Sequence, residues 1–240
     1  MRAGTADGEA ARISAAVAAV VEQVFDTVGE LHGAALRSLR AGDPTGQALE
    51  EQVRDLLGRS ARLAVGLGLV VFAGAAARSP VRLLWWQLDP ECGQLRALEP
   101  DLDPGSVGYY DCTATEWFDV PRRTGRRHVM GPYVDVHGTG RYLLTLTGPV
   151  LLSGEFAGVV GADVPVDRFE TYLLRRVGPL RHSFVLLDVD GRVVLSTAPR
   201  WLVGDLVVPA SNGPPGPART VPGVPWQLYV VPRQGLRLPA

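Results

Sequence analysis

Lysine is absent from this chain of 240 residues, cysteine occurs only twice, and the net charge at pH 7 is −1. Because nucleic-acid binding needs a concentrated basic face, this charge balance argues against a nucleic-acid partner. The one basic cluster lies within residues 122–127 and is predicted as a solvated loop. Cys92 and Cys112 are too few and too far apart for a zinc site or a redox C-x-x-C motif. They could form one disulfide, but free thiols are the expected state, since nothing in the sequence indicates an oxidising compartment.

Long apolar runs and known catalytic motifs are also missing. The longest apolar stretch, residues 63–77, contains three glycines and is shorter than the roughly twenty residues that a membrane-spanning helix needs. It is therefore predicted as a buried strand preceded by the end of a helix. No G-x-S-x-G, phosphate-binding loop or H-E-x-x-H motif occurs, and no basic start leads into an apolar core with a cleavage site. We therefore expect a cytoplasmic protein that has no membrane span, no cofactor and no enzymatic activity.

Two amphipathic helices are predicted near the N-terminus, after a disordered tail of small and polar residues at positions 1–8. Between residues 9 and 39, apolar side chains recur every three or four positions, which is the period of one helix face. Gly42, Asp43 and Pro44 then break the helix. A capped restart at Thr45 predicts a second helix that runs to about residue 58.

Beyond residue 60 the pattern changes to short apolar strands. Residues 81–88 are predicted as a strand, residues 89–93 as a hairpin turn supplied by Asp, Pro and Gly, and residues 94–99 as the return strand. Two further strands are predicted at residues 142–152 and 156–164. Helices followed by antiparallel hairpins predict an α+β fold with a mixed antiparallel sheet, flanked by the long N-terminal helices.

Residues 171–240 predict a smaller second α/β lobe. A short helix is expected within residues 164–178, followed by a hairpin of residues 183–189 and 192–196. Asp188 and Asp190 are interpreted as turn residues, because the other loop ligands of a calcium hand are absent. Residues 210–217 are expected to form a Gly- and Pro-rich loop, and residues 226–231 a last strand.

The candidate binding residues lie between residues 109 and 167. A polar, aromatic run opens this stretch, and a lone acid, Asp163, lies inside the valine- and glycine-rich strand near its end. Burying a carboxylate is unfavourable by several kcal/mol unless a partner compensates it. An acid that faces aromatic rings is one way in which proteins bind a small cation. The alternative is that Asp163 only ends the strand and accepts a hydrogen bond from a backbone amide.

This stretch resembles the ligand pocket of the Cache (PAS-like) sensor superfamily, specifically of the double-Cache domains that bind amino acids and amines. The resemblance covers residues 60–170 well and the remainder more loosely. It implies N-terminal helices at 9–60 that flank the sheet and often form a dimer contact, a ligand-binding Cache module at 61–170 and a second Cache-like lobe at 171–240. The candidate ligand-binding residues are Tyr110, Asp111, Thr115, Trp117, Phe118, Tyr133 and Asp163.

One position departs from the family pattern. Thr115 stands where amino-acid-binding members carry an arginine that holds the ligand carboxylate, whereas the aspartate and the tyrosines hold the ammonium group. Because Asp163 is present and that arginine is absent, the resemblance predicts an amine or a quaternary ammonium ligand. An arginine of the connector could replace it, which keeps amino acids as an alternative; the candidates are Arg122, Arg123, Arg126 and Arg127. His128 and His137 flank Tyr133 and could line the pocket, but the histidines have no metal-ligand spacing.

The chain shows no transmembrane, kinase, cyclase or helix-turn-helix pattern. The resemblance therefore implies a free-standing sensor that binds a small molecule and signals through a separate regulator, with a homodimer expected through the N-terminal helices. A second hypothesis is a dimeric interaction protein that keeps the fold and has lost ligand binding. Asp163 distinguishes the two hypotheses. A pocket that no longer binds a ligand gains nothing from a buried acid, so the presence of Asp163 favours the sensor.

Overall fold

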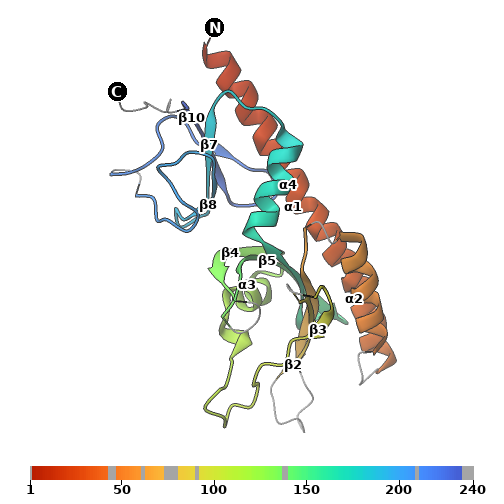
Figure 1. Ribbon diagram of the computed structural model, residues 1–240. Coiled ribbons are helices and arrows are strands. Elements are labelled where there is room, and N and C mark those ends of the chain that lie inside the picture. The colour runs from red at the N-terminus through yellow and green to blue at the C-terminus, as the bar shows by residue number, and fades with distance from the viewer. Residues whose placement is uncertain are drawn as a thin grey trace. The chain divides into compact units, whose positions relative to one another are not determined.

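The computed structural model describes residues 2–42, 47–60, 63–72, 81–89, 92–136, 140–208 and 211–233. The chain forms two compact units, one of Met1–Glu22 with Phe169–Ala240 and the other of Gln23–Arg168. The predicted boundaries 9–60, 61–170 and 171–240 differ from this division. The reason is visible in Figure 1: the first helix is long and continuous, and its two halves belong to different units.

Both predicted N-terminal helices are confirmed, as α1 (Arg2–Ala41) and α2 (Gln47–Ser60). Gly42, at φ 65°, follows the end of α1, whereas Asp43, Pro44 and Thr45 lie outside the described residues. The periodic apolar positions of α1 are the buried ones, namely Ile13, Val17, Val20, Val21, Val24, Val28, Leu31 and Ala35.

The predicted disordered tail at residues 1–8 is wrong for residues 2–8, which form the first turns of α1. Contacts within the same unit hold this end of the helix. Asp7 pairs with Arg219, and the Glu9 carboxylate accepts hydrogen bonds from the backbone N–H groups of Arg181 and His182. Such contacts with residues far along the chain leave no local signal in the sequence.

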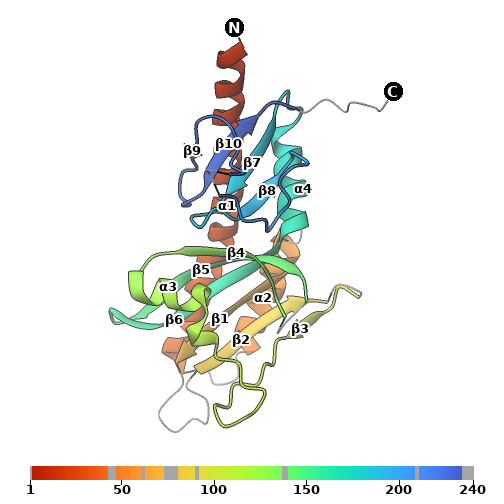
Figure 2. The ribbon, with the colours of Figure 1, turned by 90° about the vertical axis from the view of Figure 1, so that its left-hand side faces the viewer.

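A six-stranded sheet forms the centre of the unit Gln23–Arg168, with the strand order β3-β2-β1-β6-β5-β4 and antiparallel neighbours throughout. Its strands are β1 (Gly66–Phe72), β2 (Val81–Leu88), β3 (Leu95–Ala97), β4 (His128–Val134), β5 (Tyr142–Leu152) and β6 (Glu155–Pro165). All of them except β4 were predicted, and the α+β class is confirmed. Figures 1 and 2 show α2 on one face of this sheet and a short helix, α3 (Glu116–Thr124), on the other.

Helix α3 corrects the prediction of a solvated loop for residues 122–124, because Arg122 and Arg123 lie in its last turn. Residues 125–127 follow the helix as an exposed loop, as predicted. Pro121 lies inside the helix and has no N–H to donate to the carbonyl of Trp117, four residues earlier. That carbonyl instead accepts a hydrogen bond from the buried hydroxyl of Thr147 in β5, at 2.7 Å. The helix is thereby tied to the sheet at the residue that carries its main aromatic side chain. A single 3-10 turn, Cys112–Ala114, precedes α3.

The unit of Met1–Glu22 and Phe169–Ala240 contains a four-stranded sheet in the order β8-β7-β10-β9. Its strands are β7 (Ser183–Leu187), β8 (Val193–Ser196), β9 (Arg219–Thr220) and β10 (Gln227–Val231). Helix α4 (Val166–Val177) packs Phe169 edge-to-face on Trp226. The predicted helix, hairpin and last strand are thus confirmed, and Figure 2 shows this sheet in blue.

The turn between β7 and β8 is also confirmed. Asp188 Oδ1 accepts hydrogen bonds from the backbone N–H groups of Asp190 and Arg192, at 2.9 and 2.8 Å, which is the use expected of an aspartate at a turn. Within the described ranges, no three acidic, histidine or cysteine side chains come together as a metal site. Of the helices described, none is long and apolar enough to span a bilayer.

Candidate functional site

One row of residues crosses four strands of the six-stranded sheet at the candidate site. Asp163 in β6 lies opposite Gly66 in β1 and Thr145 in β5, and Gly66 in turn lies opposite Gln87 in β2. Directly opposite residues point to the same face of a sheet. The parallel row two residues along consists of Trp85, Gly68, Gly161 and Thr147. Thr147 contacts α3, so both rows lie on the face that α3 covers.

Asp163 is buried, with 4% of its surface exposed, and its carboxylate accepts three hydrogen bonds from neutral side chains. Trp85 Nε1 and Gln87 Nε2 donate to Oδ2 at 2.8 and 3.0 Å, and Thr145 Oγ1 donates to Oδ1 at 2.8 Å. The alternative that Asp163 meets only a backbone amide is therefore wrong. A carboxylate has about four lone-pair positions, so the described part of the chain leaves one position on Oδ1 for a further donor.

Tyr133 joins the same network through a bulge in β4. The pairing with β5 shifts between Met130, which lies opposite Thr145, and Tyr133, which lies opposite Leu143. One extra residue on one strand reverses the alternation beyond it, so Met130 and Tyr133 point to the same face. The Tyr133 hydroxyl lies 2.8 Å from Thr145 Oγ1. Because Thr145 uses its proton on ionised Asp163, Tyr133 is then the donor of this bond.

Burial dominates the electrostatics of the network. Loss of water raises the pKa of Asp163 to about 6, while the bonds from Gln87 and Thr145 oppose that rise. The nearby charge of Asp135 raises it further, and Gln87 Nε2 also lies 3.4 Å from Asp135 Oδ2. Burial likewise raises the pKa of Tyr110 to about 12 and lifts that of Tyr133. Both tyrosines are therefore neutral hydroxyl donors at physiological pH.

A small cavity of about 30 Å³ opens directly above Asp163. This is room for only one or two water molecules, so a larger ligand enters only when part of the wall moves. The wall contains two carboxylates, four aromatic rings and, among the described residues, no positively charged side chain. Its residues are Leu83, Trp85, Gln87, Leu98, Tyr110, Trp117, Tyr133, Asp135, Thr145 and Asp163.

Four of the predicted site residues meet at this cavity: Tyr110, Trp117, Tyr133 and Asp163. Phe118 does not line it. Its ring is fully buried in an aromatic cluster with Phe72 and Phe156, at centroid distances of 5.9 and 5.7 Å. The Phe118 ring packs edge-to-face on that of Trp117, at a centroid distance of 6.2 Å, so Phe118 supports Trp117 from the core and does not itself line the cavity.

Asp111 and Thr115 also lie outside the cavity lining. Asp111 caps the turn before α3 by accepting from the N–H and the hydroxyl of Thr113, and the Thr115 hydroxyl donates to the carbonyl of Cys112 at 2.6 Å. Both residues therefore shape the chain that leads into α3, and Cys112 is buried in the core beneath it.

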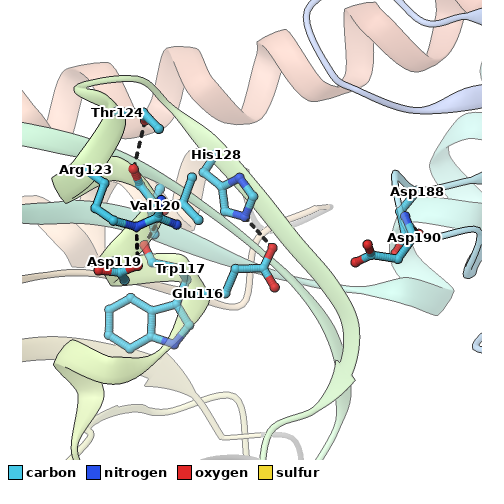
Figure 3. Close-up of polar contacts among 10 residues, drawn as sticks. Glu116, Trp117, Asp119, Val120, Arg123, Thr124, His128, Asp188 and Asp190 are labelled. Atoms are coloured by element: carbon cyan, nitrogen blue, oxygen red, sulfur yellow. Dashed lines mark hydrogen bonds and ion pairs between the residues drawn. The ribbon is translucent and has the colours of Figure 1, made fainter.

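Arg123 and His128 of the connector have ion-pair partners at the surface (Figure 3). Arg123 pairs with Asp119 at 2.6 Å, and His128 Nε2 lies 2.7 Å from Glu116 Oε1. The guanidinium of Arg127 stacks over the ring of Phe25, while Arg122 and Arg126 are exposed. None of the four connector arginines lines the cavity. His137 lies outside the described residues.

Sequence reasoning missed the residues that hold Asp163 from neighbouring strands, namely Trp85, Gln87 and Thr145. Trp85 was assigned to a strand without a role, and Gln87 is a polar residue at the end of an apolar run. A buried polar side chain in a central strand is the signal that could have identified Gln87 and Thr145. Their placement beside Asp163 depends on strand register, which the sequence does not display.

No protein-family model matches the sequence. A stretch of 101 residues, 40% of this chain, is 29% identical to the methyl-accepting chemotaxis protein TlpQ of Pseudomonas aeruginosa. The match spans only 14% of that receptor's length.

Solved structures match over much more of the chain. A structure of methyl-accepting chemotaxis protein X has a TM-score of 0.68 and 18% identity, covering 95% of this chain and 96% of that one. The ligand-binding domain of the Pseudomonas aeruginosa PAO1 amino acid chemoreceptor PctC, in complex with GABA, has a TM-score of 0.59 and 20% identity, covering 91% and 95%. The domain of the Campylobacter jejuni chemoreceptor Tlp3 with L-norvaline has a TM-score of 0.52 and 15% identity, covering 86% and 74%. The chain therefore has the fold of chemoreceptor ligand-binding domains.

Proposed function

We propose that this chain is a sensor domain for a small cationic amine, which binds Asp163 beneath the aromatic rings of the cavity. The observation that carries this proposal is the state of Asp163. Its carboxylate is buried, its three hydrogen-bond partners are neutral, and one lone-pair position on Oδ1 is left over. A cation at that position supplies the opposite charge that the lining residues lack.

The aromatic rings suit the same ligand. Trp117 and Tyr110 line the cavity together with Tyr133, and the faces of such rings attract a cation within about 6 Å. A primary ammonium group adds directed hydrogen bonds to Asp163 and to a tyrosine oxygen. A quaternary ammonium group has no N–H to donate and depends on the rings alone. The network of hydroxyl groups therefore favours a primary amine over a quaternary one.

Amino acids are the second candidate, because the matching structures of PctC and Tlp3 contain GABA and L-norvaline. An amino acid brings a carboxylate that needs a positive partner. Thr115 bonds to a backbone carbonyl, Arg123 pairs with Asp119, and the remaining connector arginines also lie away from the lining. An amino acid would place its carboxylate near Asp163 and Asp135 without a compensating cation, so the geometry favours a simple amine.

A thermal-shift panel tests the proposal with methylammonium, tetramethylammonium, GABA and L-valine. A ligand at one hundred times its dissociation constant stabilises the protein by about 2.7 kcal/mol, which is several degrees in melting temperature for a chain of this size. We expect a shift with methylammonium that disappears in Asp163→Asn. The control is Asp55→Asn, which removes an exposed carboxylate of α2 that pairs with Arg59; it should respond like the wild-type protein.

Two outcomes would contradict the proposal that the ligand is an amine. A shift with GABA or L-valine alone would establish an amino-acid sensor. No shift with any member of the panel would contradict ligand binding at this cavity and favour a dimeric interaction protein that keeps the fold.

Three features stay predictions. These are the separate regulator that reads the sensor, a homodimer formed through the N-terminal helices, and a cytoplasmic location. Sedimentation of the purified chain with and without methylammonium measures its oligomeric state and shows whether the ligand changes it. Cell fractionation tests the location.

A further inference from the structure

Trp85 lies flat across the sheet over three glycines. An added Cβ at Gly68 would lie 2.8 Å from Trp85 Cδ2, one at Gly161 would lie 3.1 Å from Cη2, and one at Gly66 would lie 3.1 Å from Nε1. The indole therefore runs from β2 across β1 to β6, through space that any larger residue would fill. Such close approach is a common reason for glycine inside a strand.

This position holds Trp85 more firmly than Tyr110, which forms another part of the cavity wall. The indole is only 5% exposed, and its Nε1 donates to Asp163 Oδ2 at 2.8 Å. Tyr110, also in the lining, comes from the segment between β3 and the turn at Cys112, which contains no regular strand or helix, and it is only partly buried. Leu98, at the start of this segment, is held to β2, because its backbone N–H donates to the Trp85 carbonyl at 2.7 Å. A ligand can displace Tyr110 and the irregular chain around it at lower cost than an indole that lies across three strands.

We propose that Trp85 is the residue that selects ligands by size, because its indole closes the cavity along the sheet while its N–H holds Asp163 in place. The inference rests on the proposed binding of amines. An ammonium group on Asp163 then has to direct its carbon chain away from the sheet, toward Tyr110. Bulky or long chains pointing along the sheet are excluded by the indole.

Titration calorimetry with methyl-, butyl- and hexylammonium tests the size limit in Trp85→Phe. The smaller ring opens space along the sheet, so the affinity for butylammonium relative to methylammonium should rise by about tenfold, the usual effect of one methylene group in a hydrophobic pocket. The matched control is Trp86→Phe. Trp86 is equally buried, at 6% exposed, but points to the other face of the sheet, and this variant should keep the wild-type ratio. An unchanged ratio in Trp85→Phe would overturn the size limit.

A second measurement needs no ligand. The hydrogen bond from Trp85 lowers the pKa of Asp163, so Trp85→Phe should raise that pKa above about 6, whereas Trp86→Phe should leave it unchanged. A carboxyl-carbon NMR titration, assigned with Asp163→Asn, measures this shift, which a purely structural role in packing would not produce. An unchanged pKa in Trp85→Phe would overturn the positioning role. If the wild-type protein bound none of the ammonium ions, the proposed function and the size limit would both fall, while this titration would still decide the positioning of Asp163.

Discussion

Burial and hydrogen bonding act in opposite directions on the carboxyl group of Asp163. Loss of water raises its pKa to about 6, and the donors Gln87, Thr145 and Trp85 limit the rise. Three neutral dipoles thus keep the group ionised at neutral pH, and a bound ammonium ion would add the missing counter-charge. Both the stability of the fold and the binding of a cation are therefore linked to one proton.

We predict that Asp163 makes the free energy of unfolding depend on pH between about 4 and 6. The carboxyl has a pKa of about 3.9 in an unfolded chain and about 6 in the folded protein, so the folded state binds the proton more tightly. Its contribution to stability is therefore greatest at low pH and decreases as the pH rises to 6, by about 2 kcal/mol between pH 4 and pH 7.

Urea unfolding of the wild-type protein and Asp163→Asn at pH 4 and pH 7 measures this effect. The variant cannot titrate at this position, so it should gain stability relative to the wild-type protein as the pH rises. A stability difference that is the same at both pH values would mean that Asp163 does not titrate in this range.

At the scale of elements, the contact between α3 and β5 positions Trp117 over the cavity. Pro121 deprives the Trp117 carbonyl of its helical partner, and the Thr147 hydroxyl replaces that partner. A helix of nine residues is too short to be stable alone. Its place on the sheet therefore depends on this bond and on the burial of Trp117 and Phe118.

We predict that Thr147→Val destabilises the protein by about 1–3 kcal/mol, because the near-isosteric side chain leaves a buried carbonyl without a donor. Thr124→Val is the control on the same helix, since its hydroxyl also donates to a helix carbonyl but is exposed, so water replaces it. Urea unfolding measures stability, and hydrogen exchange shows whether α3 opens first. Equal effects of the two substitutions would refute the role of Thr147.

The glycines of the sheet allow a second comparison between elements. An added Cβ at Gly161 in β6 would lie 2.6 Å from Thr147 Cγ2 and 2.7 Å from the Leu146 carbonyl oxygen, whereas one at Gly148 in β5 would meet nothing within 4 Å. We predict that Gly161→Ala is destabilising by about 1–3 kcal/mol through overpacking, and that Gly148→Ala is neutral or slightly stabilising. Melting temperatures of the two variants test this prediction. An unchanged melting temperature in Gly161→Ala would show that the residues around Gly161 can move to make room for a methyl group.

The strands that sequence analysis identified have strong local signals. Residues 81–88 and 142–152 are apolar runs bounded by turn residues, and the structure has strands over the same spans. Helix α3 lacked such a signal, because Pro121 and a run of charged residues argue against a helix. Two features that are not local in sequence hold it: the bond from Thr147, in a strand thirty residues away in sequence, and the burial of Trp117 and Phe118.

At the scale of the whole molecule, the register of strand pairing determines which residues meet at the candidate site. Asp163, Tyr110, Tyr133 and Trp117 could be selected from the sequence as an acid and aromatic residues in one stretch. Gln87 and Trp85 join them only because β1 pairs with both β2 and β6, which brings residues that are 76 and 78 positions away to Asp163. Phe118 was predicted at the site because it follows Trp117 in the sequence, but its ring packs edge-to-face on that of Trp117, at 6.2 Å between centroids, and does not line the cavity.

The division of the chain follows the same principle. Helix α1 reads in the sequence as one uninterrupted amphipathic segment, yet Met1–Glu22 and Gln23–Arg168 belong to different compact units. Periodicity identifies the apolar face of a helix but not the element that covers it. The sequence alone therefore does not show where the helix passes from one unit to the other.

The central claim, that a cationic amine binds to ionised Asp163, is tested most directly by calorimetric titration of methylammonium into the wild-type protein at pH 8 and pH 5. Aliphatic amines keep their charge over this range, whereas the carboxyl of Asp163 at the cavity, with a pKa of about 6, changes its charge within it. We predict binding at pH 8 and about tenfold weaker binding at pH 5, where a proton competes with the ligand. Equal affinity at the two pH values, or no binding at pH 8, would contradict the account.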